Sequence, residues 1–309
     1  QARRQPGSAF KPLIYSAALE HGLTPASIIN DAPVVFSDVS LESIWRPENY
    51  SGQVFGPTRL REALIHSRNL VSIRVLRQIG LPAALAHIEK LGLSTDQMSP
   101  TLSLALGAAE VTPIELAASY APFANGGLRV QPWFIERVQV NDRDLLFGVR
   151  PERGISAGNA WLMRSMLEDV VREGTGRSAM RLGREDLAGK TGTTNDQNDA
   201  WFAGFNGDVV ATAWVGFDEL QSLGRYETGG RAALPIWIDF MEQALRGKPN
   251  TNWVRPPGVV TLRIDSHTGE RTSPDNPNAR FETFLEDSLP AQDDSARRES
   301  EGSGAEPIF

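Results

Sequence analysis

The sequence predicts an α+β fold, in which an antiparallel β-sheet is covered by helices and joined to an all-helical subdomain, with the functional site at their junction. Two observations predict it. Apolar residues recur at helical spacing in five stretches of the first 125 positions, whereas three strand-like runs follow one another from residue 190. The last two runs are joined by Asn206-Gly207, a strong hairpin signal. Helices followed by consecutive antiparallel strands are typical of this class.

The first half of the chain is predicted to be mainly helical. Thr112-Pro-Ile-Glu115 has the pattern of a capping box with proline at the first helical position, and its helix is expected to end at Asn125-Gly-Gly127. Residues 23–57 are rich in Pro, Asn, Asp and Ser without a sustained period, so we interpret them as a long surface excursion. The other helices are expected at residues 8–19, 58–65, 70–78 and 82–91.

The second half is predicted to contain the sheet. A hairpin is expected from the alternation over 133–140 and 145–149, and Ser156 is the expected cap of a helix over 161–171. The remaining expected elements are strands at 190–194, 200–205 and 209–217, a covering helix at 235–245 and a short strand at 259–264. We expect one domain over residues 1–289 and a disordered, charged tail over residues 290–309.

Composition excludes several classes of function. The 309 residues are 40% hydrophobic and 22% charged, as in ordinary globular domains. There is no run of about 18 apolar residues that could span a membrane. A net charge of -7 without a basic stripe argues against a nucleic-acid partner. The chain has no cysteine, and its four histidines are scattered without ligand spacing, so we expect neither a metal nor a cofactor.

Lysine is used sparingly in this sequence. Of 31 basic residues only four are lysines, namely Lys11, Lys90, Lys190 and Lys248. Arginine stays protonated in proteins, whereas a buried lysine can lose its proton. Lysine is therefore expected where the chemistry needs a neutral amine, and two of the four lie in the motifs described next.

The first motif is Ser8-Ala-Phe-Lys11 at the start of a predicted helix. Residues three apart share a helix face, so the Lys11 amine could reach the Ser8 hydroxyl. A serine becomes a nucleophile when a base takes its proton, and a lysine can be that base when burial or another cation lowers its pKa. The unpaired N–H of Ser8 could also stabilise an oxyanion. By itself the pattern equally fits a helix cap followed by a solvated lysine.

The second motif is Ser67-Arg-Asn69, between two predicted helices. Ser67 could relay a proton between a base and a leaving amine. The amide of Asn69 has a donor end and an acceptor end, so it could hold a peptide carbonyl or fix Lys11. By itself this motif also fits an ordinary polar turn.

The third motif is Lys190-Thr-Gly-Thr193, at the start of the first strand of the predicted sheet. Gly192 would let a substrate backbone lie against the strand. The hydroxyls of Thr191 and Thr193 could hold a carboxylate, and Lys190 supplies positive charge to it and to Lys11. The alternative is a polar edge strand that prevents sheet-to-sheet aggregation.

Together and in this order, the three motifs are the signature of serine β-lactamases and penicillin-binding proteins. The chain resembles the transpeptidase domain of the class A penicillin-binding proteins, 1A type, over roughly residues 1–290. Further segments that resemble the family are residues 4–8, 104–113, 124–127, 174–176, 189–195, 199–202 and 226–230.

The resemblance implies a role for each motif residue. It makes Ser8 the acylated nucleophile and Lys11 its base. The remaining roles are proton relay and substrate amide binding for Ser67 and Asn69, carboxylate binding for Lys190, Thr191 and Thr193, and an oxyanion hole made of the N–H groups of Ser8 and Thr193.

The resemblance also implies substrates, partners and a location. The substrates would be peptidoglycan stem peptides ending in D-Ala-D-Ala, and β-lactams would acylate the same serine. Family members carry an upstream glycosyltransferase domain and a membrane anchor, so we expect both as partners, together with an outer-membrane lipoprotein activator, at the periplasmic face of the bacterial inner membrane. Only seven residues precede Ser8, so we expect an upstream polypeptide to supply the first strands of the sheet.

Three alternative functions are considered. A serine β-lactamase is disfavoured because no Glu-x-x-Leu-Asn stretch lies between Asn69 and Lys190, and because Arg68 stands where the class A enzymes have Asp. A D,D-carboxypeptidase differs only in using water instead of an amine to resolve the acyl-enzyme. A non-catalytic β-lactam sensor has similar motifs. Both of these stay open.

Overall fold

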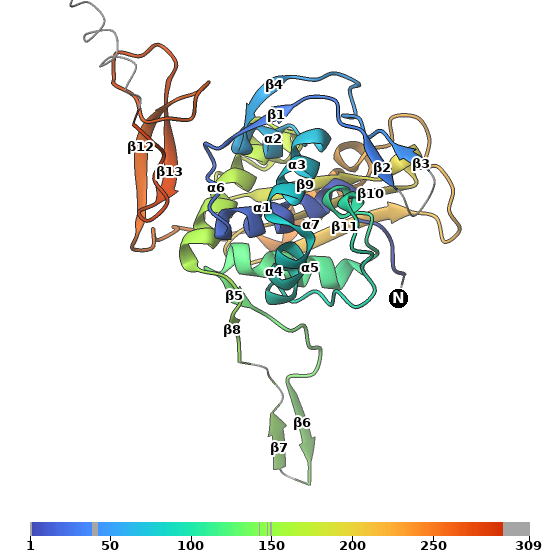
Figure 1. Ribbon diagram of the computed structural model, residues 1–309. Coiled ribbons are helices and arrows are strands. Elements are labelled where there is room, and N and C mark those ends of the chain that lie inside the picture. The colour runs from blue at the N-terminus through green and yellow to red at the C-terminus, as the bar shows by residue number, and fades with distance from the viewer. Residues whose placement is uncertain (1, 39–42, 142, 147, 149, 293–309) are drawn as a thin grey trace, which may run out of the picture.

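The computed structural model describes residues 2–38, 43–141, 143–146, 148 and 150–292. At its centre lies an antiparallel sheet with the strand order β11-β10-β9 (Figure 1). The strands are β9 (Ala188–Thr193), β10 (Asp199–Phe205) and β11 (Val210–Gly216), which confirms the three strand predictions to within two residues. β9 and β11 are the two edges of this sheet among the described residues, and the expected upstream strand stays a prediction.

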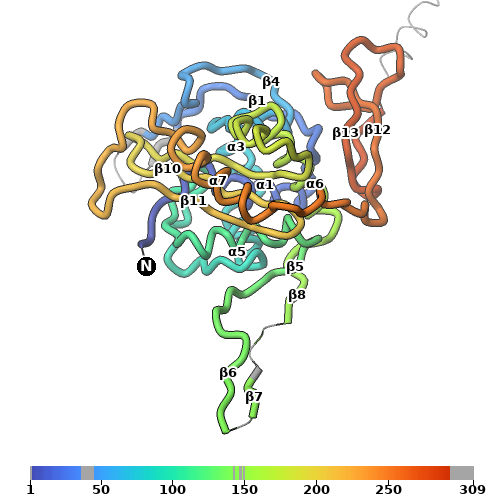
Figure 2. Tube along the Cα trace, turned by 180° about the vertical axis from the view of Figure 1, so that it is seen from behind, coloured from blue at the N-terminus to red at the C-terminus, as the bar shows by residue number. Residues whose placement is uncertain are grey.

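Helices surround the sheet (Figures 1 and 2). A turn of 3-10 helix, η1 (Gly7–Phe10), leads directly into α1 (Lys11–Glu20). The predicted helices are confirmed as α2 (Leu60–Ile65), α3 (Asn69–Ile79), α4 (Leu81–Lys90), α5 (Pro113–Ala124), α6 (Ala157–Arg172) and α7 (Leu234–Ala244). Shorter turns are η2 (Leu102–Leu106), η3 (Arg177–Leu182), η4 (Asn195–Gln197) and the π-turn η5 (Gly229–Ala233). In the described part of the chain, no helix combines the length and the apolar character that a bilayer crossing requires.

β10 is buried along its whole length because helices cover both faces of the sheet. Successive side chains of a strand point to opposite faces. Trp201, Ala203 and Phe205 therefore join the core that contains α1, α5 and α6, whereas Ala200 and Phe202 join a second core with α7. The sheet thus separates two hydrophobic cores.

α1 is the most enclosed helix of the molecule. Every residue from Lys11 to Leu19 is buried, as expected for a helix that is apolar on all sides. Pro12 lies in the first turn, where its missing N–H removes no helical hydrogen bond. Lys11 is the single charged residue of this buried stretch and is fully shielded from solvent. The fold therefore places an ionisable amine inside the core.

The helix caps predicted from the sequence are present. The Glu115 N–H donates to Thr112 Oγ1 at 3.3 Å, and the Thr112 N–H donates to Glu115 Oε2 at 2.8 Å, which completes the capping box of α5. The Asn159 N–H donates to Ser156 Oγ at 3.0 Å at the start of α6. These local contacts satisfy N–H groups that a helix start leaves unpaired.

The interpretation of residues 23–57 as a surface excursion is wrong in part. This segment contains β1 (Ile28–Asp31), β2 (Phe36–Asp38) and β3 (Ser43–Trp45), and β1 pairs with β4 (Gly56–Arg59). β4 also occupies the first two positions of the helix expected at 58–65. Strands of three or four residues are too short to produce a recognisable alternation. Asp31 and Asn49 are buried, and both lie close to the site described below.

The hairpin predicted after α5 is confirmed. It consists of β6 (Arg137–Val140) and β7 (Arg143–Leu146) and extends away from the body of the molecule (Figure 1). Its strands are shorter than predicted, and part of the predicted second strand, at positions 147 and 149, lies outside the described residues. At its base, β5 (Leu128–Arg129) pairs with β8 (Glu152–Arg153).

A second hairpin lies beside α6 (Figure 2). Its first strand, β12 (Val259–Asp265), confirms the prediction at 259–264, but its partner β13 (Ala279–Leu285) was not predicted. Hydrophilic residues such as Arg280 and Glu282 interrupt the apolar residues of β13, so the sequence does not indicate a strand there. The expected tail falls mostly on residues 293–309, which lie outside the described part of the chain.

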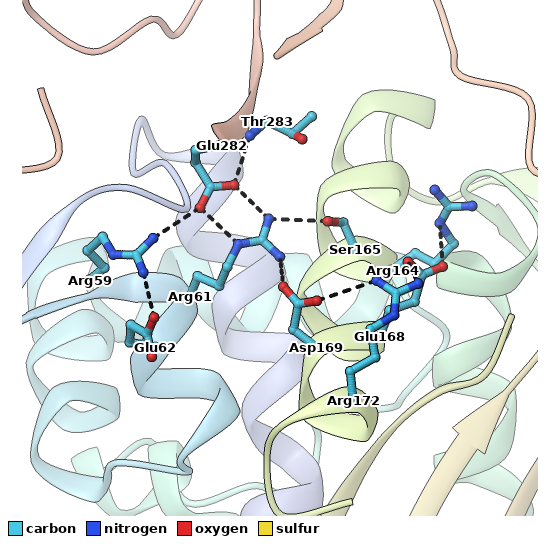
Figure 3. A network of polar contacts seen from close by, with 10 residues as sticks. All are labelled: Arg59, Arg61, Glu62, Arg164, Ser165, Glu168, Asp169, Arg172, Glu282 and Thr283. Carbon is cyan, nitrogen blue, oxygen red and sulfur yellow. Dashed lines mark hydrogen bonds and ion pairs between the residues drawn. The ribbon is translucent and has the colours of Figure 1, made fainter. Parts of the chain in front are cut away.

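A buried ionic network fastens this hairpin to the helices (Figure 3). Glu282 of β13 accepts hydrogen bonds from Arg61 of α2 at 2.8 and 2.7 Å, and Arg61 also donates to Asp169 of α6 at 2.7 Å. Arg59 of β4 lies 3.6 Å from Glu282. The bidentate geometry between a carboxylate and a guanidinium is the strongest arrangement for such a pair.

Candidate active site

The three motifs meet in one cleft of about 800 Å³ between the sheet and the helical subdomain. Five of the predicted site residues line it, namely Ser8, Ser67, Asn69, Thr191 and Thr193. Three others are buried beneath its surface, namely Lys11, Gly192 and Lys190. Residues from η1 and α1, from the turn before α3 and its first residue, and from β9 therefore share one site, although up to 185 positions separate them in the chain.

η1 holds Ser8 against the outer edge of β9. Gly7 has a positive φ of 53°, and a Cβ atom there would lie 2.5 Å from the carbonyl oxygen of Thr193. A Cβ at Gly107 would in turn overlap the carbonyl of Gly7. Only glycine permits this left-handed backbone and this close approach. The two glycines therefore set the position of Ser8 at the mouth of the cleft.

Lys11 donates three hydrogen bonds, all to the second motif. Its Nζ lies 2.7 Å from Ser67 O, 3.2 Å from Ser67 Oγ and 2.7 Å from Asn69 Oδ1. The ammonium form would donate to all three, whereas a neutral amine donates to Ser67 O and Asn69 Oδ1 and can accept from the Ser67 hydroxyl at its lone pair. Among the described residues no hydrogen bond joins Lys11 to Ser8, in contrast to the contact that the spacing of the first motif suggests. Asn69 fixes Lys11, which is one of the two roles considered for it.

Lys190 reaches the same hydroxyl from the opposite side. Its Nζ lies 3.0 Å from Ser67 Oγ and 3.2 Å from Thr191 O. Ser67 Oγ thus lies between two fully buried amines, Lys11 and Lys190. A hydroxyl can both donate and accept, which makes this position suitable for passing a proton.

Burial lowers the pKa of both lysines. The pKa of Lys11 lies well below its ordinary value, mainly because of burial and further because of the positive charge of Lys190, while the carboxylate of Asp31 acts in the opposite direction. Burial alone lowers the pKa of Lys190 to about 7. Relative to an exposed lysine, the site therefore shifts both amines toward the neutral form.

The backbone at Ser67 adopts an unusual conformation. Its φ is 56°, in the left-handed region that residues other than glycine rarely occupy. The residue connects the end of α2 to the start of α3, and this geometry aims both its carbonyl and its hydroxyl at Lys11. Such conformations persist where the surroundings hold them and are frequent at active sites.

β9 presents backbone and hydroxyl groups along the cleft. Thr194 donates to the carbonyl of Asp199 at 3.1 Å, so the alternation of an antiparallel ladder turns the N–H of Thr193 away from β10. Thr193 Oγ1 accepts from the Gly229 N–H at 3.1 Å, which leaves its own hydrogen free to donate. Thr191 Oγ1 lies 2.6 Å from Thr175 Oγ1.

The structure shows a packing requirement for Gly192, while its expected role in substrate binding stays a prediction. It is buried and does not border the cleft. A Cβ there would lie 2.9 Å from the Cβ of Trp201 and 3.0 Å from that of Ala9. Glycine is required because η1 packs directly on β9 at this point.

Other residues at the cleft were not found by sequence reasoning. Asn49 borders it and contacts the backbone of the second motif, and Thr175 contacts Thr191. Thr175 lies in the stretch 174–176, one of the segments that resemble the family, so it could have been predicted as a site residue. Asn49 lies in an aperiodic segment that contains no such stretch, so the sequence does not indicate it. Across the described ranges, His, Asp and Glu side chains form no group that could hold a metal ion.

Comparisons with known proteins agree with this geometry. Residues 1–242 match the family described as penicillin binding protein transpeptidase domain. The chain is 45% identical to penicillin-binding protein 1A of Pseudomonas aeruginosa over 342 residues, which covers 94% of this chain and 42% of that protein. It is 42% identical to penicillin-binding protein 1A of Neisseria cinerea over 316 residues, which covers 100% of this chain and 39% of that protein.

A solved structure shows the same fold. The structure of penicillin-binding protein 1A from Haemophilus influenzae superimposes with a TM-score of 0.88 at 35% identity, covering 94% of this chain and 49% of that chain. The chain thus spans less than half of the length of these three relatives.

Proposed function

The chain belongs to the penicillin-binding protein transpeptidase family, and from this membership we propose that it cross-links peptidoglycan stem peptides through an acyl-enzyme on Ser8. One observation carries the proposal: Ser67 Oγ contacts two buried lysines whose pKa values are lowered, and Ser67 and Ser8 both line the same cleft. This arrangement provides a base, a proton relay and a nucleophile in one place.

In the first step, the hydroxyl of Ser8 attacks the carbonyl between the two terminal D-Ala residues of a stem peptide. Neutral Lys11 takes the hydroxyl proton and passes a proton to the Ser67 hydroxyl as Ser67 gives its own to the amine of the departing D-Ala, so both side chains return to their starting forms. A C–O ester bond forms and the C–N peptide bond breaks. Lys11 and Ser8 need not be hydrogen-bonded in the free protein, since catalytic contacts often tighten only when substrate binds.

Backbone N–H groups would stabilise the developing oxyanion. The N–H of Thr193 points away from β10, and η1 places Ser8 against the same edge. Donors that are fixed before the reaction stabilise negative charge without reorganisation. These N–H groups form the proposed oxyanion hole.

The terminal carboxylate of the substrate is proposed to bind at β9. Thr191 and Thr193 border the cleft and offer hydroxyl groups. Lys190 is fully buried, so it acts on the carboxylate through its charge and through its contact with Thr191 rather than by direct contact. β-Lactams carry an equivalent carboxylate and would bind in the same way.

The acyl-enzyme is resolved by an amine from a second stem peptide, which restores Ser8 and forms the cross-link. We propose that the whole protein carries a membrane anchor and a glycosyltransferase domain upstream of this domain in the sequence. This domain would then lie at the periplasmic face of the bacterial inner membrane. An outer-membrane lipoprotein activator is a further proposed partner.

The test is intact mass spectrometry of the full-length protein after mixing with benzylpenicillin, with Ser8→Ala as the matched control. A stable adduct that maps to Ser8 and is absent from the variant supports the proposal, whereas rapid return to the free mass indicates a β-lactamase. Incubation with a D-Ala-D-Ala peptide and a D-amino acid acceptor then separates the remaining functions. Exchange of the terminal residue indicates a transpeptidase, hydrolysis alone a carboxypeptidase, and no turnover a sensor.

A further inference from the structure

A buried carboxylate outside the three motifs lies close to the proposed base. Asp31, the last residue of β1, is fully shielded from solvent. Its only side-chain hydrogen bonds in the described part of the chain come from the amide nitrogen of Asn49, which lies 2.8 Å from Oδ1 and 2.9 Å from Oδ2. A carboxylate is costly to bury, so such a group needs an explanation beyond packing.

Asn49 connects this carboxylate to the second motif. Its Oδ1 accepts from the N–H of Asn69 at 2.7 Å and from the N–H of Leu70 at 3.3 Å, which caps the start of α3 from a distant segment. Its Nδ2 also donates to Gln53 O at 2.9 Å. Both ends of the amide are therefore occupied, with the oxygen accepting on one side and the nitrogen donating on the other, which a carboxylate in its place could not do.

The same segment also holds the side chain of Asn69. Asn69 Nδ2 donates to the carbonyl of Glu48 at 2.8 Å, and Asn69 Oδ1 accepts from Lys11 at 2.7 Å. A continuous chain of hydrogen bonds thus runs from Asp31 through Asn49 and Asn69 to the amine of Lys11. Each link orients the next one.

The carboxylate also acts on Lys11 through its charge. The positive charge of Lys190 lowers the pKa of Lys11, and the carboxylate of Asp31 raises it. The other ionisable groups around this pair are Tyr15, whose pKa burial raises, and Arg68, whose pKa burial lowers while Asp31 raises it. Asp31 therefore opposes the two effects that keep the Lys11 amine neutral.

We propose that Asp31 and Asn49 are positioning residues of the active site: Asn49 holds Asn69 in place for Lys11, and Asp31 holds Asn49 and sets the charge balance at the base. This inference rests on the proposed function, because it concerns how the base of that reaction is prepared. Asp31 is fully buried and does not border the cleft, so it acts through Asn49 and through its charge.

The experiment measures the second-order rate of benzylpenicillin acylation against pH in the full-length protein. Asp31→Asn keeps the shape and an acceptor for Asn49 but removes the charge. The pKa of Lys11 then falls further, so the acidic limb of the profile is expected to move to lower pH by about one unit. Asp186→Asn is the control, because Asp186 is also buried and accepts from an asparagine, Asn206, at 3.2 Å, but its other partners are Arg184 and Thr251 rather than residues at the site.

A second variant tests the hydrogen bonds. Asn49→Asp cannot donate to Asp31 and sets two carboxylates side by side, so acylation is expected to slow by about tenfold or more. The exchanged pair Asp31→Asn with Asn49→Asp restores one donor and one acceptor, and it is expected to recover most of the loss. If Asn49→Asp does not fold, Asp31→Asn and the exchanged pair still decide the matter.

Two results overturn the inference. The first is an Asp31→Asn profile that superimposes on that of the unmodified protein, and the second is an equal displacement in Asp186→Asn, which would indicate a general effect of weakening a buried carboxylate. If the unmodified protein is acylated at Ser8 in either case, the proposed function stands and only this inference fails. If the unmodified protein is not acylated, both fail.

Discussion

The amine of Lys11 lies 2.7 Å from the amide oxygen of Asn69, although 58 positions separate the two residues. Lys11 also contacts the carbonyl and the hydroxyl of Ser67, so all three of its partners are neutral. A carboxylate partner would favour the charged ammonium, whereas a neutral acceptor orients the amine with less effect on its pKa. This pairing therefore holds Lys11 in place while leaving it able to act as a base.

The first prediction concerns the charge of residue 11. Lys11→Arg keeps a positive charge but cannot supply a neutral amine, so benzylpenicillin acylation is expected to fall to background, as is also expected for Lys11→Ala. Labelling with a fluorescent penicillin followed by mass spectrometry measures this. Lys90→Arg, at an exposed position of α4, is the matched control and keeps the full rate. An active Lys11→Arg variant would show that the position supplies charge alone.

The second prediction concerns the pH dependence of acylation. The positive charge of Lys190 lowers the pKa of Lys11, so its removal in Lys190→Met raises that pKa. A larger fraction of Lys11 is then protonated at a given pH, and the acidic limb of the rate profile moves to higher pH. Stopped-flow measurements with a chromogenic cephalosporin give the profile. An unmoved or oppositely moved limb contradicts the proposed coupling.

The third prediction concerns stability. Burial lowers the pKa of Lys190 from 10.5 to about 7 in the folded protein, whereas the unfolded chain binds the proton up to the ordinary value. Protonation therefore favours unfolding below pH 10.5, and stability rises as the pH increases from about 7 to 10.5. Lys190→Met has no buried amine to protonate. The difference in free energy of unfolding between this variant and the unmodified protein should therefore favour the variant most below pH 7, and less as the pH rises above 7. Urea unfolding of both proteins at several pH values measures this difference. A difference that does not change with pH would show that the pKa of Lys190 is not lowered by folding.

The fourth prediction concerns substrate binding at β9. Thr193→Ala keeps the backbone N–H and loses the hydroxyl, so donors that carry a carboxylate should acylate more slowly while an ester without one is little affected. Thr193→Ser is the control, because it keeps a hydroxyl that can accept from the Gly229 N–H. Equal slowing with both kinds of donor would mean that the hydroxyl takes part in the chemical step.

The fifth prediction concerns the hairpin formed by β12 and β13. Glu282→Ala leaves the buried guanidinium of Arg61 with one carboxylate partner fewer, and the free energy of unfolding is expected to fall by about 3 kcal/mol. Glu286→Ala removes an exposed carboxylate of the same segment and should change stability by less than about 0.5 kcal/mol. Urea denaturation measures both variants. Similar small losses in the two would show that the network in Figure 3 contributes little.

Local features of this protein could be predicted from its sequence. The capping box at Thr112, the cap at Ser156 and the Asn206-Gly207 turn each depend on residues a few positions apart, so their patterns are complete within a short window. The helices and strands of the main core follow from apolar periodicity for the same reason.

Contacts between distant segments could not be predicted. β13 has a broken apolar pattern because Glu282 faces Arg61 of α2, and the reason for a buried acid is visible only in its partner. The short strands and frequent polar residues of the segment that contains Asp31 and Asn49 indicate an exposed segment, although both residues are buried. Their burial became evident only where the segment packs on α3.

By itself, the sequence determined the fold class, the family and the residues of the three motifs, because each of these depends on patterns of residues that lie a few positions apart. Only the tertiary structure decided that Lys11 contacts Ser67 and Asn69 and, among the described residues, has no hydrogen bond to Ser8, that packing requires glycine at position 192, and that Asp31 is buried and bonded to Asn49. The physical reason is that a side chain's partners and its solvation, which set hydrogen bonds and pKa values, come from segments that the folded chain brings together from far apart.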